Sequence, residues 1–355
     1  MSGEIESSPS FSDRLRGIHA ATIVPMTSDF LIDEPALAAH IASVASVPDI
    51  NGLLVNGHAG ENFVLSLAEK RRVMEIAREH APKNCLVVSG VNHESSLEAA
   101  REAAALERAG ADGLLVFPPN SWALPHADTC VIEHHRRVRD ATTVPLMLYA
   151  APIGSGAMAY AGPLLEQLVA DRRFVAIKEG SWEVAAYEHN LRLVRERRPD
   201  FTVLSSGDEH LLTSYVIGTA GSQVSLAAVA PELVVGLWRS ALAGDLGEAR
   251  AIHEKLYPLV TAIYRDAPGG RAPARLKACL KLLGRLACDA VRPPQPSVTP
   301  TEQRALELAL RTAGCLNESD DWSPGGRLVK RDAAPLGSLE QRPTAPRWGE
   351  GCIAP

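Results

Sequence analysis

Lys178 is the residue whose setting in this 355-residue chain most clearly suggests chemistry. It closes the apolar run 174–177 and precedes Glu179 and Gly180, a pattern typical of a chain that leaves a buried strand. Poor solvation disfavours the ammonium form of an amine, so such a lysine can attack a carbonyl carbon and form a Schiff base. For this residue taken alone, the alternative is a lysine that only extends its amine from a strand end into water.

A tyrosine and a loop bounded by glycines have the residue types that would assist such a lysine. Tyr149 ends the apolar run 145–149, and Gly57 and Gly60 follow the run 52–55. Schiff-base chemistry on a 2-oxo acid needs a group that moves protons on and off the carbinolamine, and a polar cradle for the carboxylate. The tyrosine hydroxyl can move the protons, and backbone N–H groups of the loop can bind the carboxylate. Each feature is also common in purely structural positions, so the interpretation rests on their joint placement.

Short apolar runs alternate with amphipathic segments through most of the chain. This alternation predicts parallel strands joined by right-handed crossovers, and eight such units predict an α/β fold, the (β/α)8 TIM barrel. Neighbouring strands lie about 5 Å apart, and barrel active sites lie where the strands end. We therefore expect Tyr149 and Lys178 to face one cavity. The expected strands are 20–24, 52–55, 86–91, 113–117, 145–149, 174–178, 202–205 and 222–226, with helices such as 67–80, 95–109 and 184–198 between them.

The pattern changes after residue 230. Consecutive helical segments predict a C-terminal helical region over 231–316, beside a catalytic barrel over 17–230. We expect a flexible N-terminus over 1–16 and a disordered tail over 317–355, because the tail has few apolar residues. The expected C-terminal helices are 231–243, 246–267, 272–286 and 301–313.

Composition excludes several classes of partner. The 36 basic and 42 acidic residues give a net charge of −6 without a basic run, so nucleic acid is not expected as a partner. The N-terminus is polar and unlike a signal peptide or a membrane anchor. Six cysteines without a CxxC pair are typical of reduced thiols. We expect a cytoplasmic protein that has no membrane contact and binds a small molecule.

Three segments carry a resemblance to a known family. Residues 57–61 (GHAGE), 149–152 (YAAP) and 177–179 (IKE) are similar to the GxxGE, YxxP and IKE signatures of the dihydrodipicolinate synthase / N-acetylneuraminate lyase family. The similarity runs from about Gly17 to about Leu316. It implies a class I lyase, usually a homotetramer built as a dimer of dimers, that needs no metal and no organic cofactor.

The resemblance also implies roles for individual residues. Lys178 matches the lysine that forms an imine with pyruvate or another 2-oxo acid, and Tyr149 matches the proton-transferring tyrosine. The 57–61 loop matches the carboxylate-binding loop, but its two inner positions, typically hydroxylic in the synthase, are His58 and Ala59 here. A hydrogen bond from a hydroxyl to a carboxylate is worth about 1.5–3 kcal/mol, and this loop lacks it. Three explanations stay open: the loop amides alone bind the carboxylate, His58 replaces the hydroxyl, or the ligand has a different head group. His58 is a candidate catalytic residue, as a second acid or base that titrates near neutral pH, or else a hydrogen-bonding filler.

Two further departures bear on the second substrate. The synthase has an arginine shortly after the YxxP proline, where this chain has the small residues 153–156 (IGSG). The aromatic pair that feeds the synthase's proton relay is replaced by 118–121 (PPNS). We therefore expect an enzyme other than the lysine-pathway synthase, which admits a bulkier or neutral partner. The expected substrate-binding residues are Gly57, Ala59, Gly60, Gly154, Ser155 and Gln223.

Two other sets of polar residues are expected to have structural roles. His134 and His135 are adjacent on an expected helix, so their side chains diverge by about 100° and cannot share a metal; a solvated helix face is expected. Asp208 is expected to cap the helix that follows it.

The function that these residues predict is a lyase that forms a Schiff base between Lys178 and a pyruvate-type 2-oxo acid. It would catalyse aldol cleavage or condensation with an aldehyde as second partner. One alternative is a dehydratase or deaminase that uses the same imine. The other is a catalytically silent barrel that binds a 2-oxo acid, motivated by Ala59 and the missing aromatic pair.

Overall fold

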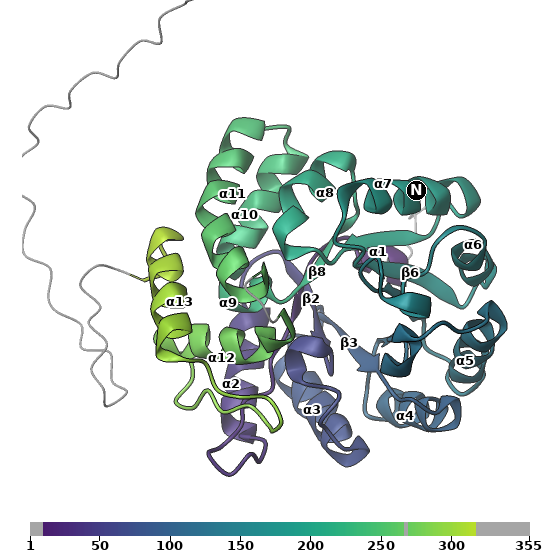
Figure 1. Ribbon diagram of the computed structural model, residues 1–355, viewed down its shortest axis with the longest axis horizontal. Helices are drawn as coiled ribbons and strands as arrows, with labels where there is room; N and C mark the ends of the chain where they lie inside the picture. The colour runs from purple at the N-terminus through teal and green to yellow at the C-terminus, as the bar shows by residue number, and fades with distance from the viewer. Residues whose placement is uncertain (1–9, 266–268, 317–355) are drawn as a thin grey trace, which may run out of the picture.

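Eight parallel strands close into a barrel in the computed structural model, which describes residues 10–265 and 269–316 (Figure 1). Each strand pairs with its sequence neighbours and β8 pairs with β1, so the expected (β/α)8 barrel is confirmed. Most of the expected flexible N-terminus and the expected tail lie outside the described residues. The strands are β1 (Gly17–Ala21), β2 (Ile50–Val55), β3 (Leu86–Val91), β4 (Gly113–Val116), β5 (Leu146–Ala150), β6 (Phe174–Glu179), β7 (Thr202–Ser205) and β8 (Gly221–Val224).

The first strand begins earlier than the sequence pattern indicates. It spans Gly17–Ala21, whereas the apolar run suggested 20–24. Glycines allow the barrel to close there, because a Cβ on Gly221 would lie 1.9 Å from the Gly17 carbonyl oxygen. Residues 22–24 are buried but lie beyond the strand. An apolar run does not distinguish a buried strand from a buried loop.

Helices surround the barrel, one after each of the first seven strands (Figure 1). In α3 the helix start is fixed by a capping box between Ser66 and Glu69, and Val73 and Ala77 face the strands. The other helices of the ring also bury residues against the protein, although α4, α5, α6 and α8 have no side-chain cap. The helices are α2 (Glu34–Ala45), α3 (Leu67–His80), α4 (Ser96–Arg108), α5 (Asp128–Asp140), α6 (Gly162–Ala170), α7 (Val184–Arg197) and α8 (Leu211–Ile217), and a short α1 (Phe11–Arg14) precedes β1.

His134 and His135 on α5 are both buried, which corrects the expectation of a solvated helix face. His134 Nδ1 lies 3.0 Å from Ser96 Oγ, and His135 Nε2 lies 3.2 Å from the Tyr160 hydroxyl. The reason is that α5 contacts α4 on one side and α6 on the other. The two histidine side chains, which point about 100° apart on α5, are therefore both covered by neighbouring helices.

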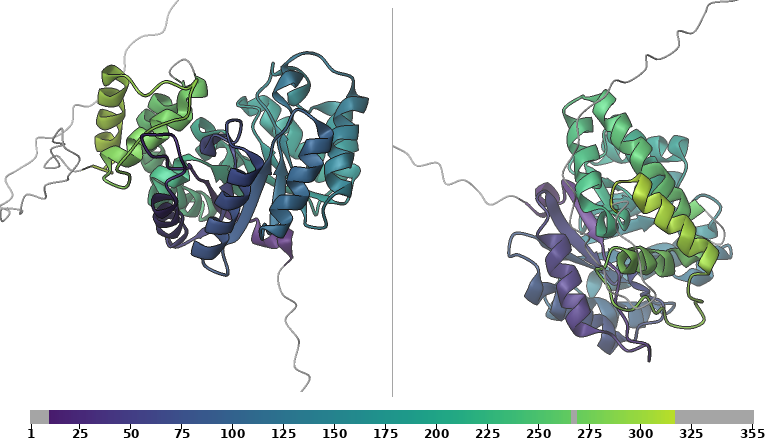
Figure 2. Two further views of the ribbon diagram at one scale, coloured as in Figure 1. Left: turned by 90° about the horizontal axis from the view of Figure 1, so that it is seen from below. Right: turned by 90° about the vertical axis from the view of Figure 1, so that its left-hand side faces the viewer.

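The C-terminal helical region gathers on one side of the barrel (Figure 2). Its helix α12 contacts the short turn η1 (His58–Gly60) that follows β2, so this region reaches the mouth of the barrel. The expected helix 246–267 changes its winding into a π-helical turn, η5 (Thr261–Arg265). No helix among the described residues is long and apolar enough to cross a membrane. The helices are α9 (Leu226–Val229), α10 (Pro231–Leu242), α11 (Leu246–Val260), η6 (Gly269–Arg271), α12 (Ala272–Leu282) and α13 (Pro300–Thr312).

Candidate active site

Tyr149 and Lys178 lie side by side at the mouth of the barrel. They are register partners on β5 and β6, and Lys178 Nζ lies 5.7 Å from the centroid of the Tyr149 ring. Both side chains are buried. A Cβ on Gly180 would come within 3.3 Å of the Tyr149 ring and 2.7 Å of the Ala150 carbonyl oxygen. The glycine after β6 therefore leaves the space that the phenol occupies.

A cavity of about 610 Å³ opens at this end of the barrel. This volume is in the range of sites that hold drug-sized ligands, so it has room for more than a three-carbon acid. The strand ends form its floor, and the loops and the C-terminal helical region form its rim. The floor residues with polar or reactive groups include His58, Tyr149, Lys178, Ser206, Asp208 and Ser225.

Burial changes the protonation of the lysine and of a nearby aspartate. Desolvation lowers the pKa of Lys178 to about 8, and the negative charge of Asp208 opposes this shift. Burial raises the pKa of Asp208 to about 6, while the Leu226 N–H and the Lys178 charge act to lower it. Both groups can therefore exchange protons near neutral pH, which suits a nucleophilic amine and an acid or base beside it.

Asp208 is a site residue that sequence reasoning assigned another role. It was expected to cap the helix that follows it, but its Oδ1 accepts the backbone N–H of Leu226 at the start of α9, at 2.9 Å. Neither the turn η4 (Asp208–His210), which begins at Asp208, nor the following helix α8 has a side-chain cap. The only sequence signal was its place just beyond β7, since every strand end of a barrel leads to the mouth.

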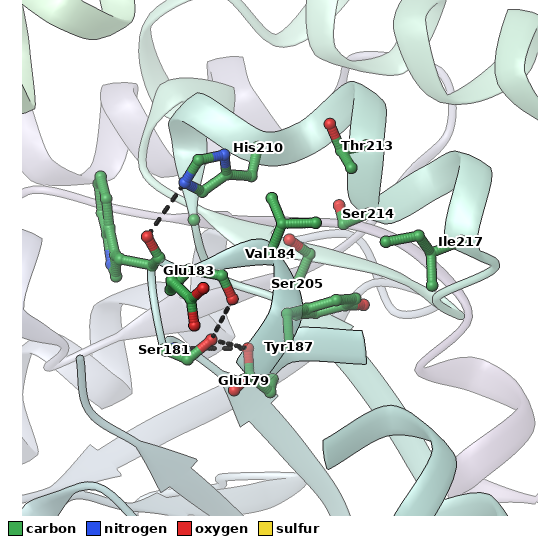
Figure 3. Close-up of a pocket in the computed structure, with 12 residues that line it drawn as sticks. Glu179, Ser181, Glu183, Val184, Tyr187, Ser205, His210, Thr213, Ser214 and Ile217 are labelled. Carbon is green, nitrogen blue, oxygen red and sulfur yellow. Dashed lines mark hydrogen bonds between the residues drawn. The ribbon is translucent and has the colours of Figure 1, made fainter. Parts of the chain in front are cut away.

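Tyr149 keeps its proton, and its neighbouring carboxylate faces away from the cavity. Burial first, and then the negative charges of Glu179 and Asp208, raise the pKa of Tyr149. Glu179 lies on the other face of β6 from Lys178. Its carboxylate accepts hydrogen bonds from Ser181 (Figure 3) and from Asn190. It orders the chain that leaves β6.

His58 sits in a small aromatic cluster on the cavity floor. Its ring centroid lies 4.3 Å from that of Phe117 and 5.5 Å from that of Tyr149, edge-on to the latter. Burial, and then the Lys178 charge, lower the pKa of His58 to about 4. The imidazole is therefore neutral at pH 7, and the near-neutral titration that motivated an acid or base role is shifted well to the acid side. No group of three or more His, Cys, Asp or Glu within the described ranges is placed to hold a metal ion.

The 57–61 loop is anchored by the C-terminal helical region. Glu61, in the left-handed conformation at φ 55°, forms a fully buried ion pair with Lys277 of α12. The backbone N–H of Arg292 donates to the same carboxylate at 3.0 Å. Ala59 lines the cavity, and a Cβ on Gly60 would lie 3.3 Å from the Thr22 carbonyl oxygen. The loop is thus held from below by the barrel and from the side by α12.

Of the residues expected to bind substrate, Ala59 lines the cavity, whereas Gly57, Gly60, Gly154, Ser155 and Gln223 are not part of the lining. Gly154 has φ 86° in an open turn, where a Cβ would meet no atom within 4 Å, and Ser155 follows it before η3 (Gly156–Met158). Gln223 is fully buried on β8, next in register to His19, and both its amide atoms lack a hydrogen-bond partner among the described residues. It lies two residues before Ser225, which does line the cavity.

The rim of the cavity contains side chains that sequence reasoning missed. Trp182 comes from the loop after β6, Tyr264 from η5, and Arg271 from the turn before α12. Arg271 places a cation in the cavity, although the 153–156 loop has none. No sequence signal links positions 264 and 271 to strand ends, because they arrive through long-range packing.

Comparisons with known proteins give one consistent result. The model of the dihydrodipicolinate synthetase family matches residues 14–313. A 4-hydroxy-tetrahydrodipicolinate synthase of Nitrobacter hamburgensis is 31% identical over 305 residues, which cover 86% of this chain and 98% of the relative. The "Putative 2-dehydro-3-deoxy-D-gluconate aldolase YagE" of Escherichia coli is 27% identical over 287 residues, covering 80% and 92%. The crystal structure of YagE in complex with pyruvate is similar at a TM-score of 0.76 and 26% identity, covering 85% of this chain and 99% of that one.

Proposed function

The chain belongs to the dihydrodipicolinate synthetase family, and from that premise we propose that Lys178 forms an imine with pyruvate or a related 2-oxo acid. The enzyme is a class I lyase, and we assign it aldol cleavage or condensation with an aldehyde as second partner. The observation that carries the assignment is a buried lysine, its pKa lowered to about 8, beside a buried tyrosine in one cavity.

The arrangement supports each step of an imine reaction. The neutral Lys178 amine attacks the 2-oxo carbon, and the Tyr149 hydroxyl passes a proton to the carbinolamine oxygen, which leaves as water. The iminium group draws electrons from the neighbouring carbon, so loss of a proton there gives an enamine. The enamine carbon then attacks the aldehyde carbon, and the new alkoxide takes up a proton. Hydrolysis of the imine releases the product and restores the amine.

The 57–61 loop is proposed to bind the carboxylate of the 2-oxo acid. The amides of Gly60 and Glu61 already donate within the turn, to the carbonyls of Gly57 and His58. The amides of His58 and Ala59 are therefore the ones we assign to the carboxylate. The neutral His58 ring packs beside Tyr149 and is assigned a hydrogen-bonding role toward the substrate. Gln223 is assigned to support the floor from below.

The second partner is proposed to differ from that of the lysine-pathway synthase. Residues 153–156 are not among those that line the cavity, so this loop brings neither a cation nor a side chain to it. The large cavity is left open on this side and admits a bulkier aldehyde. Relatives named as synthases match this chain over most of its length, and a shared fold does not determine the second substrate.

A homotetramer, built as a dimer of dimers, and a cytoplasmic location are further parts of this proposal. Both rest on the resemblance to the family. Light scattering coupled to size-exclusion chromatography tests the first: a mass four times that of one chain supports it, and a monomer contradicts it.

Borohydride trapping tests the imine directly. Incubation with pyruvate and sodium borohydride, followed by peptide mass mapping, should add one reduced pyruvate to the peptide that contains Lys178. The variant Lys178→Arg, which keeps the charge but lacks a nucleophilic amine, should show no adduct. An adduct on another lysine, or none where a family member is labelled in parallel, would refute the assignment.

Elimination through the same imine is a second candidate, favoured by one observation. Asp208, with a pKa raised to about 6, lies beside Lys178 and can protonate a departing hydroxyl or amino group. Product analysis separates the candidates: an aldehyde and pyruvate indicate an aldolase, whereas a deoxygenated 2-oxo acid or ammonia indicates elimination. A barrel that only binds its ligand would give no product after long incubation.

A further inference from the structure

The backbone of Trp182 is held in an unusual conformation. Its φ is 57°, in the left-handed region that bulky residues rarely adopt. The His210 imidazole stabilises this conformation, since its Nε2 lies 3.1 Å from the Trp182 carbonyl oxygen. The bond requires the proton on Nε2. Strained backbone that persists in this way is concentrated at functional sites, and here it brings the indole to the rim of the cavity that contains Lys178.

A second irregular segment brings Tyr264 to the same rim. The chain leaves α11 and continues as the π-helical turn η5, a rare geometry that is frequent at functional sites. The Tyr264 hydroxyl is hydrogen-bonded to Ser225 Oγ at the end of β8, and it also lowers the pKa of Asp208. Its polar end therefore already has partners in the protein. What Tyr264 offers to a ligand is the face of its ring.

The two rings form one wall. Their centroids lie 5.8 Å apart and their planes differ by 55°. Apolar side chains from other elements extend this lining: Phe63, which is 47% exposed, and Pro273 in the first turn of α12. Pockets that bind a flat apolar group present such rigid aromatic faces. The wall lies above the floor where the imine carbon would be.

Two polar side chains of the rim, Arg271 and Gln295, are committed to the protein, whereas the Asn120 amide has no side-chain hydrogen bond among the described residues. Arg271 donates to the Ser297 carbonyl and pairs with Glu302 at 2.9 Å. Gln295 donates to the Gly270 carbonyl. Arg271 Nε lacks a hydrogen-bond partner among the described residues. A substrate with an anionic group is therefore the strongest alternative to one with an apolar group. A polyol would need several uncommitted polar groups, and these two side chains offer few.

We infer that the Trp182 and Tyr264 rings are the subsite for the second partner, and that this partner is an aldehyde with a flat apolar group, such as an aryl aldehyde. The inference rests on the imine function proposed above. The reaction is balanced without a further reactant: the enamine carbon bonds to the aldehyde carbon, the aldehyde oxygen takes a proton, and water releases a 4-hydroxy-2-oxo acid that carries the aryl group at C4. The reverse reaction returns pyruvate and the aryl aldehyde.

Competition among three probe aldehydes tests the inference. With pyruvate as donor, kcat/KM is measured for benzaldehyde, glyceraldehyde and succinic semialdehyde, which are aryl, polyol and anionic. Benzaldehyde should give the highest value. Trp182→Ala should lower kcat/KM for benzaldehyde about tenfold, while the value for glyceraldehyde changes much less. Trp182→Phe and Tyr264→Phe, which keep an aromatic face, should retain the preference. Leu308→Ala, an exposed position on α13, is the control that should change nothing.

Two results would overturn the inference. One is a wild-type preference for glyceraldehyde or succinic semialdehyde. The other is an equal loss for all three aldehydes in Trp182→Ala; if the alanine variant does not fold, Trp182→Leu, which is apolar but has no aromatic face, is measured in its place. Borohydride trapping of pyruvate is run on the same samples. A trapped imine without aryl preference defeats this inference alone, whereas no imine defeats the proposed function as well.

Discussion

The floor and the rim of the cavity are built by different means. On the floor, Tyr149 and Lys178 are neighbours because the register of β5 and β6 makes them so. On the rim, Trp182 and Tyr264 depend on a left-handed residue and a π-helical turn, each stabilised by contacts with distant segments. The regular part of the fold therefore places the two residues that we propose react, and the irregular part shapes the rim of the cavity beside them. The two regions should respond differently to mutation.

Tyr149→Phe should give the largest effect on catalysis and leave the rim intact. The ring packing against His58 and Phe117 remains, and only the hydroxyl, which we propose carries protons, is lost. We expect kcat to fall by about 10²- to 10⁴-fold, with the melting temperature and the order of preference among aldehydes unchanged. Steady-state kinetics and circular dichroism measure both. A wild-type kcat would remove Tyr149 from the mechanism, and a changed aldehyde preference would mean that floor and rim are not separable.

Lys277→Met tests the connection between the two regions. The substitution leaves the Glu61 carboxylate buried without its cation, which typically costs about 3–5 kcal/mol. The 57–61 loop should loosen, so we expect a lower free energy of unfolding together with a higher KM for pyruvate. Chemical denaturation and kinetics report the two quantities.

A matched control lies one helical turn further along α12. Lys281 pairs with Asp289 in a partly exposed site, so Lys281→Met should cost only about 0–1 kcal/mol and leave KM unchanged. The double variant Glu61→Gln with Lys277→Met should recover part of the loss, because no charge is left buried. Equal effects of Lys277→Met and Lys281→Met would show that the buried pair does not anchor the loop.

The sequence predicts the floor far better than the rim, for a physical reason. A run of apolar residues that ends in Tyr149 or Lys178 reports a strand end, and in a barrel all strand ends meet, so the two could be brought together from sequence alone. Asp208 shows the limit of local rules: it does cap a helix, but α9 across the mouth instead of the helix next to it. Tyr264 and Arg271 follow no periodic pattern that leads to the mouth. Their positions result from how the C-terminal helices pack on the barrel.

Asp208→Asn sharpens the electrostatic account of the floor. The pKa of Lys178 lies below its ordinary 10.5, so the neutral amine appears as the pH rises through about 8. The Asp208 charge raises that pKa, so its removal should move the rising limb of imine formation to lower pH. The rate of pyruvate trapping as a function of pH measures the limb. Asp200→Asn, at an exposed position, should leave the limb in place.

The same substitution has a consequence for stability. The pKa of Asp208 in the fold, about 6, lies above its ordinary 3.8. The protonated Asp208 therefore stabilises the fold fully below about pH 3.8, and this stabilisation is lost as the pH rises through about 6. Asp208→Asn should remove this part of the pH dependence of the free energy of unfolding.

The kinetic result has its own contradicting outcome. If the rise of the trapping rate with pH does not move in Asp208→Asn, that rise does not report the deprotonation of Lys178.

His210→Ala should give the smallest effect, confined to the rim. The imidazole donates one hydrogen bond to the Trp182 carbonyl, and such a bond is worth about 0.5–1.5 kcal/mol. If the indole is part of the aldehyde subsite, loss of this hydrogen bond should raise KM for benzaldehyde about two- to tenfold. The values of kcat and of KM for pyruvate should not change. His210→Gln, whose amide can donate to the same carbonyl, should recover part of the effect, and His189→Ala, on the exposed face of α7, should have none. An increase in KM for pyruvate instead would place His210 with the floor, because a residue that acts only through Trp182 has no route to the carboxylate loop.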